Sequence, residues 1–207
     1  MIDLYTWTTP NGRKISIALE EMELAYTVKA INIRNNEQFA PDFLKISPNN
    51  KIPAIVDTET GTSVFESGAV LIYLAEKSGR FLGAAGTDAR AKALEWLMWQ
   101  VGGFGPMLGQ LAHFAMYRED KIPEAIERFS TEAGRLYRVL DTQLGKTDFV
   151  AGEYSIADMA IYPWSAGGLE AVSGMSGQSY DNVARWHKAM EARPAVAKGM
   201  TIPPSVD

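Results

Sequence analysis

The sequence predicts a small α/β domain followed by an all-helical domain. Up to residue 80, short segments rich in β-branched and aromatic residues alternate with amphipathic helical segments. Beyond residue 87 a helical period dominates and no strand pattern is convincing. We therefore expect domains at residues 1–80 and 88–207, joined by a linker over residues 81–87. A chain of 207 residues is long enough to hold both.

The first domain is expected to begin with a strand–helix–strand unit. Strands are predicted over residues 1–6 and 26–33, which are rich in β-branched and aromatic residues. Between them, apolar residues recur with the spacing i, i+3, i+4, i+7, which predicts a helix over residues 11–24. Because the unit is short, its two strands are expected to be parallel, with a right-handed crossover.

The rest of the first domain is expected to add a helix, two strands and a final helix. A short helix is predicted near residues 42–46, followed by an extended segment that contains Pro53. Another strand is predicted over residues 62–65. Ser67 has the side chain of an N-cap for a helix over residues 68–77, and Gly79 supplies the stop of that helix.

The second domain is expected to contain four helices. The first, over residues 88–117, is long or kinked, with a break near Gly102 and Pro106. An apolar stripe predicts the second over residues 126–144. Ser155 and Asp158 form an S-x-x-D capping box that opens the third. The fourth is predicted over residues 182–192, and the last residues are expected to be a tail.

Composition excludes several classes of function. The net charge is -5 and no run of like charges occurs, which disfavours a nucleic-acid-binding protein. Without cysteine there is no thiol nucleophile or cysteine-ligated metal, and two histidines are too few for a histidine-rich metal site. The first residues lack a signal-peptide pattern, and no apolar run is long enough to cross a bilayer. We therefore expect a cytoplasmic protein with no metal and no membrane partner.

Three places in the first domain have groups suited to ligand binding. The first is the strand-to-helix turn T-W-T-T-P-N-G, where Thr9 and Asn11 add polar side chains to a helix N-terminus. Free backbone N–H groups and a partial positive charge favour an anion at such a terminus. The plainer alternative is that Asn11 is an N-cap and the threonines are turn residues.

The second place is the Ile52–Pro53 bond. Proline in a strand-like segment marks either an edge strand or a special bond, such as a cis peptide. A cis bond would turn the backbone of Ile52 outward, where it could pair with an extended peptide ligand. An ordinary edge-strand proline is the alternative.

The third place is the start of the helix that follows the strand at residues 62–65. Ser67 as N-cap would direct free amides and a hydroxyl toward a carboxylate, and Glu66 could bind an ammonium group. A ligand with both charges at one end is an α-amino acid. A plain helix cap beside a surface glutamate is the alternative.

These motifs, in this order and spacing, resemble the glutathione transferase superfamily over essentially the whole chain. The resemblance is carried by T-P-N-G-R-K, S-P-N-N-K-I-P-A-I-V-D, E-S-G-A-V-L-I-Y-L-A and Y-S-I-A-D-M-A. Together with W-Q-V-G-G-F-G-P-M-L-G-Q they are similar to the bacterial Nu class. The resemblance implies a thioredoxin-like first domain, glutathione as co-substrate without a metal, and a homodimer.

The resemblance also implies an enzyme, a glutathione-dependent disulfide-bond oxidoreductase that reduces small or glutathione-linked disulfides. It places Thr9 and Asn11 beside the reacting sulfur atoms. The positions that it assigns to glutathione binding are Gln38, Lys51, Ile52, Pro53, Glu66, Ser67 and Arg128. From the residues alone, Arg128 has an ordinary surface pattern, with glutamates four residues before and after it.

Two alternative functions stay open on the same scaffold. One is a glutathione transferase or peroxidase that acts on apolar electrophiles or hydroperoxides. The other is a non-catalytic glutathione-binding stress protein. The intact polar side chains of Thr9, Asn11, Glu66 and Ser67 argue against the non-catalytic alternative.

Overall fold

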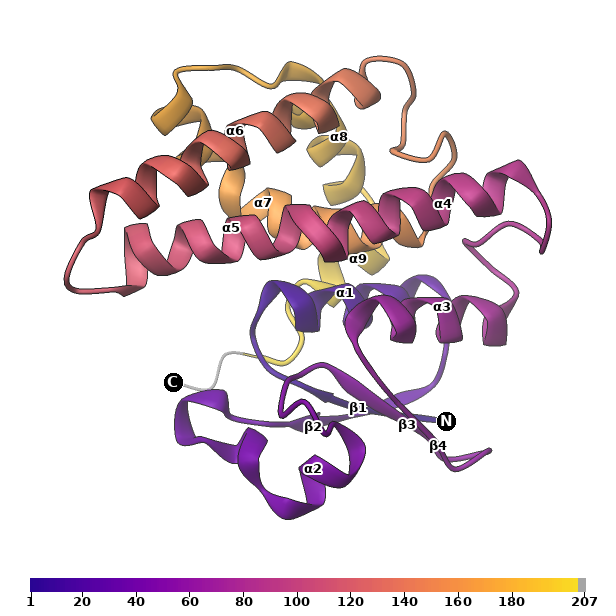
Figure 1. Cartoon of the computed structure of the whole chain (residues 1–207). Helices are drawn as coiled ribbons and strands as arrows, with labels where there is room; N and C mark the ends of the chain where they lie inside the picture. Colours follow the sequence, from indigo (N-terminus) through magenta and orange to yellow (C-terminus); the bar gives the residue numbers. More distant parts are fainter. Residues whose placement is uncertain (205–207) are drawn as a thin grey trace. The chain divides into compact units, whose positions relative to one another are not determined.

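The computed structural model describes residues 1–204, and these form two compact units (Figure 1). The first unit contains Met1–Leu82 together with the segment that starts at Glu191, and the second contains Gly83–Met190. The expected domain over residues 88–207 differs from this division at its C-terminal end, where the segment from Glu191 packs with the first unit.

The first unit is built on a four-stranded mixed sheet in the order β2-β1-β3-β4. The strands are β1 (Ile2–Thr6), β2 (Tyr26–Ala30), β3 (Ala54–Asp57) and β4 (Thr62–Phe65). β1 pairs with β2 in parallel and with β3 in antiparallel fashion, and β4 pairs antiparallel to β3. The predicted parallel strand–helix–strand unit and the predicted strand at residues 62–65 are confirmed.

Helices cover both faces of this sheet. α1 (Pro10–Glu21) and α3 (Ser67–Ser78) lie on one side in Figure 1, and α2 (Pro41–Ile46) lies on the other. The predicted stop of α3 is confirmed, because Gly79 has a φ of 69° and its N–H bonds the carbonyl of Ala75. The second strand ends at Ala30 rather than residue 33, since a 3₁₀ turn over Ile33–Asn35 follows.

A short helix near the C-terminus, α9 (Pro194–Gly199), packs against α1. The Ser16 hydroxyl donates to the carbonyl of Gly199 at 2.7 Å, and Arg193 donates two hydrogen bonds to the Glu21 carboxylate. This segment lies in the part of the chain that the sequence predicts to be a tail. Six residues are too few to show a helical period, and the contacts that hold α9 are distant in sequence.

The main elements of the second unit are all helices. They are α4 (Asp88–Trp99), α5 (Gly105–Ala112), α6 (Pro123–Leu144), α7 (Ile156–Ser176) and α8 (Asp181–Glu191). The interruption predicted in the first of these helices is present as a π-helical turn over Gln100–Phe104. A second π-helical turn, His113–Tyr117, ends α5. No helix in the described part of the chain combines the length and apolar character that a membrane span requires.

The predicted capping box at the start of α7 is confirmed. The Ser155 hydroxyl accepts from the N–H of Ala157, and the Asp158 carboxylate accepts from the N–H of Ser155 at 3.0 Å. Asp158 also accepts from the backbone of Val150 and from the indole of Trp186. Burial raises its pKa to about 6, and its four partners are all structural groups. Asp158 therefore joins the start of α7 to the loop before it and to the helix that carries Trp186.

Candidate functional site

The sheet register brings three of the expected site segments to one end of the sheet. Thr6 pairs with Ala30, Tyr5 with Ala54, and Ala54 with Phe65. The chain therefore leaves β1, enters β3 and leaves β4 at the same end. The turn with Thr9, the Ile52–Pro53 bond, and Glu66 with Ser67 follow or precede these strand ends directly.

Thr9, rather than Asn11, is the N-cap of α1. The Thr9 backbone is extended, and its hydroxyl oxygen accepts from the N–H of Gly12 at 3.1 Å. Pro10 occupies the first helical position, and Asn11 follows in the first turn. The plainer alternative from the sequence, with Asn11 as cap, is wrong because the helix begins two residues earlier than that reading requires. Both side chains are half-buried.

This terminus has the groups that an anion requires. A hydroxyl has one hydrogen to donate, and the Thr9 oxygen uses a lone pair to accept from Gly12, so its hydrogen stays available to a ligand. No acidic residue lies in the first turn of α1. The backbone N–H groups and the partial positive charge of the helix therefore favour a negative sulfur atom here.

Gly12 allows the turn to close tightly over this terminus. A Cβ atom at this position would lie 2.4 Å from both the Thr6 hydroxyl oxygen and the Trp7 carbonyl oxygen. Any larger residue would push the helix start away from the end of β1. Trp7 itself is buried, and the Tyr5 ring packs near Phe43, with ring centroids 6.2 Å apart.

The Ile52–Pro53 peptide bond is cis, as predicted. Pro53 is buried at the start of β3, Ile52 is half-buried, and Lys51 is exposed. The Ser47 hydroxyl donates to the carbonyl of Lys51 at 2.8 Å and fixes the loop that leads into the bond. The structure therefore places these three residues beside the sheet end, with the lysine ammonium at the surface.

Glu66, rather than Ser67, occupies the N-cap position of α3, which corrects the predicted cap. The helix begins one residue earlier than the sequence pattern indicated, so the Ser67 hydroxyl lies inside the first turn and is free of the capping role. Glu66 has a φ of 70°, a value that costs energy for a residue with a side chain. Its carboxylate accepts from Asn49 at 3.3 Å.

Lys14 is a site residue that the sequence pattern does not indicate. It lies in α1, is 2% exposed, and its ammonium donates to the Ser67 hydroxyl oxygen at 3.3 Å. Burial lowers the pKa of Lys14 to about 7, and the negative charge of Glu66 acts in the opposite direction. The available signal was its position four residues before Ala18, on the apolar side of the helix.

Gln38 lies in the 3₁₀ turn Glu37–Phe39, which follows β2. Its side-chain oxygen is buried and has no hydrogen-bond partner among the residues that the structure describes. A buried acceptor without a partner costs free energy, and a ligand with an N–H or ammonium group would satisfy it.

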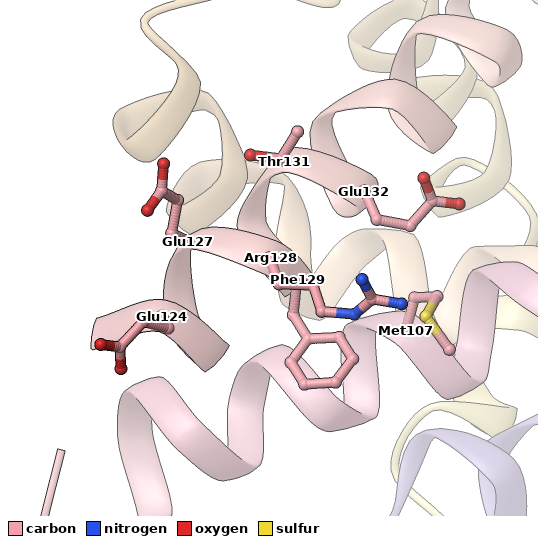
Figure 2. A pocket seen from close by; sticks show the side chains of 7 residues that line it. All are labelled: Met107, Glu124, Glu127, Arg128, Phe129, Thr131 and Glu132. Atoms are coloured by element: carbon pink, nitrogen blue, oxygen red, sulfur yellow. The ribbon is translucent and has the colours of Figure 1, made fainter. Parts of the chain in front are cut away.

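Arg128 lies on α6 in the helical unit and lines a hollow of about 590 Å³ (Figure 2). Its guanidinium group extends toward Met107, with the Phe129 ring nearby, while the carboxylates of Glu124 and Glu127 lie on the other side. The spacing in the sequence suggested ion pairs of Arg128 with Glu124 and Glu132. In the structure Glu132 instead pairs with Arg135, at 2.7 Å. The guanidinium is therefore exposed at the hollow.

No group of histidine, aspartate or glutamate side chains suited to a metal ion occurs within residues 1–204.

Two family models match the chain. Residues 1–76 match the model described as Glutathione S-transferase, N-terminal domain, and residues 104–194 match Glutathione S-transferase, C-terminal domain. These matches cover most of both compact units.

Two curated relatives are similar over nearly the whole chain. Disulfide-bond oxidoreductase YfcG of Escherichia coli (strain K12) is 48% identical over 97% of this chain and 94% of its own length. Disulfide-bond oxidoreductase YghU of the same organism is 42% identical over 97% of this chain and 74% of its own length.

Two solved structures share the fold. A glutathione transferase from Pseudomonas putida, with one glutathione disulfide bound per subunit, is 42% identical with a TM-score of 0.91, covering 98% of this chain and 91% of that one. A glutathione transferase family member from Pseudomonas fluorescens, with two glutathione bound, is 43% identical with a TM-score of 0.90, covering 98% and 93%.

Proposed function

Because the chain belongs to the glutathione S-transferase family, we propose that it is a glutathione-dependent disulfide-bond oxidoreductase acting on small or glutathione-linked disulfides. One observation of this chain carries the proposal. An anion site at the start of α1 faces the sheet end, yet the sequence has no cysteine. The sulfur nucleophile must then come from the substrate, and glutathione supplies it.

The reaction consumes two glutathione molecules and one disulfide. A glutathione thiolate attacks one sulfur of the disulfide, the S–S bond breaks, and the other sulfur leaves as a thiolate that takes up a proton. The thiolate of a second glutathione then attacks the glutathione sulfur of the mixed disulfide. The products are two thiols and one oxidised glutathione.

The protein's part in this reaction is to stabilise negative sulfur. A thiol with a pKa of about 8.5 is only a few per cent ionised at neutral pH. A hydrogen bond to a charged group contributes about 1.5–3 kcal/mol, and each pKa unit corresponds to about 1.4 kcal/mol. The Thr9 hydroxyl, together with Asn11 and the helix terminus, is therefore sufficient to lower the thiol pKa by about one to two units.

The remaining residues are assigned to holding glutathione. Ser67 and Glu66 bind the carboxylate and ammonium of the γ-glutamyl end, and the Ile52 backbone before Pro53 pairs with the cysteinyl part. Further contacts come from Gln38, Lys51 and Arg128. The partnerless Gln38 oxygen and the exposed Lys51 and Arg128 cations support these roles.

A homodimer of the Nu class, active in the cytoplasm against disulfides formed under oxidative stress, is part of the proposal. Exposed apolar side chains support self-association, among them Phe65 on the edge strand β4 and Met98 on α4, which are 37% and 48% exposed. A reduced glutathione pool, which the cytoplasm maintains, is needed to drive the reaction. Sedimentation velocity measures the oligomeric state directly.

Turnover of a small symmetrical disulfide, compared with turnover of a chromogenic aryl halide, tests the proposal. Both assays use glutathione at the same concentration and the same wild-type protein. We expect the disulfide to be reduced with the larger kcat/KM. Efficient conjugation of the aryl halide without disulfide reduction would instead identify a transferase, and no turnover of either would identify a binding protein.

A further inference from the structure

Lys14 contacts Ser67, a residue of the proposed γ-glutamyl site, from inside the protein. The two residues are 53 positions apart, and the ammonium of Lys14 lies 3.3 Å from the Ser67 hydroxyl oxygen. Lys14 is 2% exposed and Ser67 is 8% exposed, so the contact lies beneath the surface on which a ligand would sit. The ammonium therefore acts from behind the site.

The chemistry of the two groups fixes the direction of their hydrogen bond. In its ammonium form, Lys14 donates and has no lone pair, so the Ser67 oxygen must accept from it. The serine hydrogen is then directed elsewhere. Because Glu66 rather than Ser67 occupies the N-cap position, the hydroxyl is not used to cap α3.

We propose that Lys14 is a positioning residue that holds the Ser67 hydroxyl as a donor to the γ-glutamyl carboxylate and places a positive charge behind that carboxylate. This inference rests on the proposed function, in which Ser67 and Glu66 bind that end of glutathione. Lys14 itself touches no reacting atom. It acts through Ser67 and through its charge.

Other charged groups lie on the elements that pack against α1. Of the cations on the elements packed against α1, Lys198 of α9 pairs with Glu20, and Lys77 at the far end of α3 pairs with Asp57. Arg193, before α9, pairs with Glu21. The negative charge of Glu66 favours the ammonium form of Lys14, whereas burial disfavours it. An arriving carboxylate favours the ammonium form, so ligand binding should draw a proton onto Lys14.

Burial by itself does not favour a lysine at this position. Burying a charge is costly, and replacing a buried charge by an apolar side chain of similar size is often neutral or stabilising. A purely structural lysine would instead be needed for folding. Lys14→Met keeps the length of the side chain and removes the charge and the donors, so it separates the two roles.

The experiment measures glutathione binding by calorimetry to the wild type, Lys14→Met, Ser67→Ala and the double variant, with thermal unfolding of each. We expect each single change to raise Kd about tenfold or more, and the double variant to raise Kd by less than the product of the two single effects, because part of the effect of Lys14 passes through Ser67. We also expect the melting temperature of Lys14→Met to equal or exceed that of the wild type. In kinetics, Lys14→Met should raise KM for glutathione with kcat unchanged.

Proton uptake supplies a second readout. Binding enthalpies measured near pH 7.5 in buffers of different ionisation enthalpy should show uptake of a fraction of a proton by the wild type and by Ser67→Ala, and none by Lys14→Met. Lys14→Gln, which keeps an N–H donor without the charge, replaces Lys14→Met if the latter does not fold. It should also lose the proton uptake.

The outcomes distinguish this inference from the proposed function. Wild-type protein that binds no glutathione overturns both. If the wild type binds glutathione but the Lys14 variants have an unchanged Kd, only the role of Lys14 is overturned. The same holds if the effects of the Lys14 and Ser67 substitutions on the binding free energy add fully.

Discussion

The hydroxyl oxygen of Thr9 accepts the backbone N–H of Gly12 at 3.1 Å, so one side chain both caps α1 and retains a hydrogen for a ligand. From the sequence, the plainer alternative makes Thr9 a turn residue rather than a helix cap. In the structure the same side chain caps α1 and lies at the proposed sulfur site. A change at Thr9 should therefore affect stability as well as chemistry.

Thr9→Ala should lower the free energy of unfolding by about 0.5–2 kcal/mol, the usual cost of removing a hydroxyl N-cap. Thr9→Ser keeps the hydroxyl and serves as the matched control, with stability close to that of the wild type. Urea unfolding followed by circular dichroism measures both. Equal stability of the alanine and serine variants would show that the cap contributes nothing.

The close approach of α9 to α1 should make Gly199 intolerant of any side chain. A Cβ there would lie 2.6 Å from the backbone nitrogen and Cα of Ile17, and neither helix can move without loss of packing. Gly199→Ala should therefore destabilise the protein by about 1–3 kcal/mol.

Gly167→Ala is the matched control, since a Cβ at this position of α7 meets nothing within 4 Å. It should stabilise the protein by about 0.5–1 kcal/mol through helix propensity. Thermal unfolding of the two variants gives opposite shifts in this account. A destabilised Gly167→Ala or a neutral Gly199→Ala contradicts the packing described for these helices.

His187 should make the stability of the helical unit depend on pH. It is buried beside the Ser165 hydroxyl at 2.8 Å, and burial lowers its pKa to about 4. Between the unfolded value of about 6.5 and the folded value, the unfolded chain binds a proton that the folded chain does not. This contribution to stability is therefore complete above pH 6.5 and is lost as the pH falls toward 4, by up to about 3 kcal/mol.

Urea unfolding of the wild type and His187→Gln at pH 7 and pH 4.5 measures this effect. The variant should lose less stability over that interval. Because the comparison is between the two proteins, the opposite contribution of the raised pKa of Asp158 cancels. If both proteins lose the same free energy of unfolding between pH 7 and pH 4.5, His187 does not cause the pH dependence.

The elements that the sequence predicted well have local signals. The strand Thr62–Phe65, the stop at Gly79 and the capping box of Ser155 with Asp158 depend on residues within a few positions of each other. The sequence also predicted the site segments that the register gathers at one sheet end.

The features that the sequence missed depend on contacts between distant residues. α9 is held by Ser16 and Glu21, and Lys14 contacts Ser67, which is 53 positions away. In the sequence Lys14 is one polar residue in a helical segment. The observed N-caps, Thr9 and Glu66, lie two residues and one residue before the cap candidates in the sequence, Asn11 and Ser67. Sequence does not distinguish these positions well, because the neighbouring side chains are also suited to capping.

Disulfide turnover by Thr9 and Asn11 variants tests most directly whether the start of α1 stabilises sulfur anions. Thiol–disulfide exchange has both an attacking and a leaving thiolate, so a donor placed at the sulfurs acts on both. Thr9→Ala and Asn11→Ala should each lower kcat with a small disulfide by about ten- to a thousandfold. Both should lower any aryl-halide turnover less, and Thr9→Ser should stay near the wild type. Disulfide turnover at the wild-type rate in both alanine variants would contradict the account.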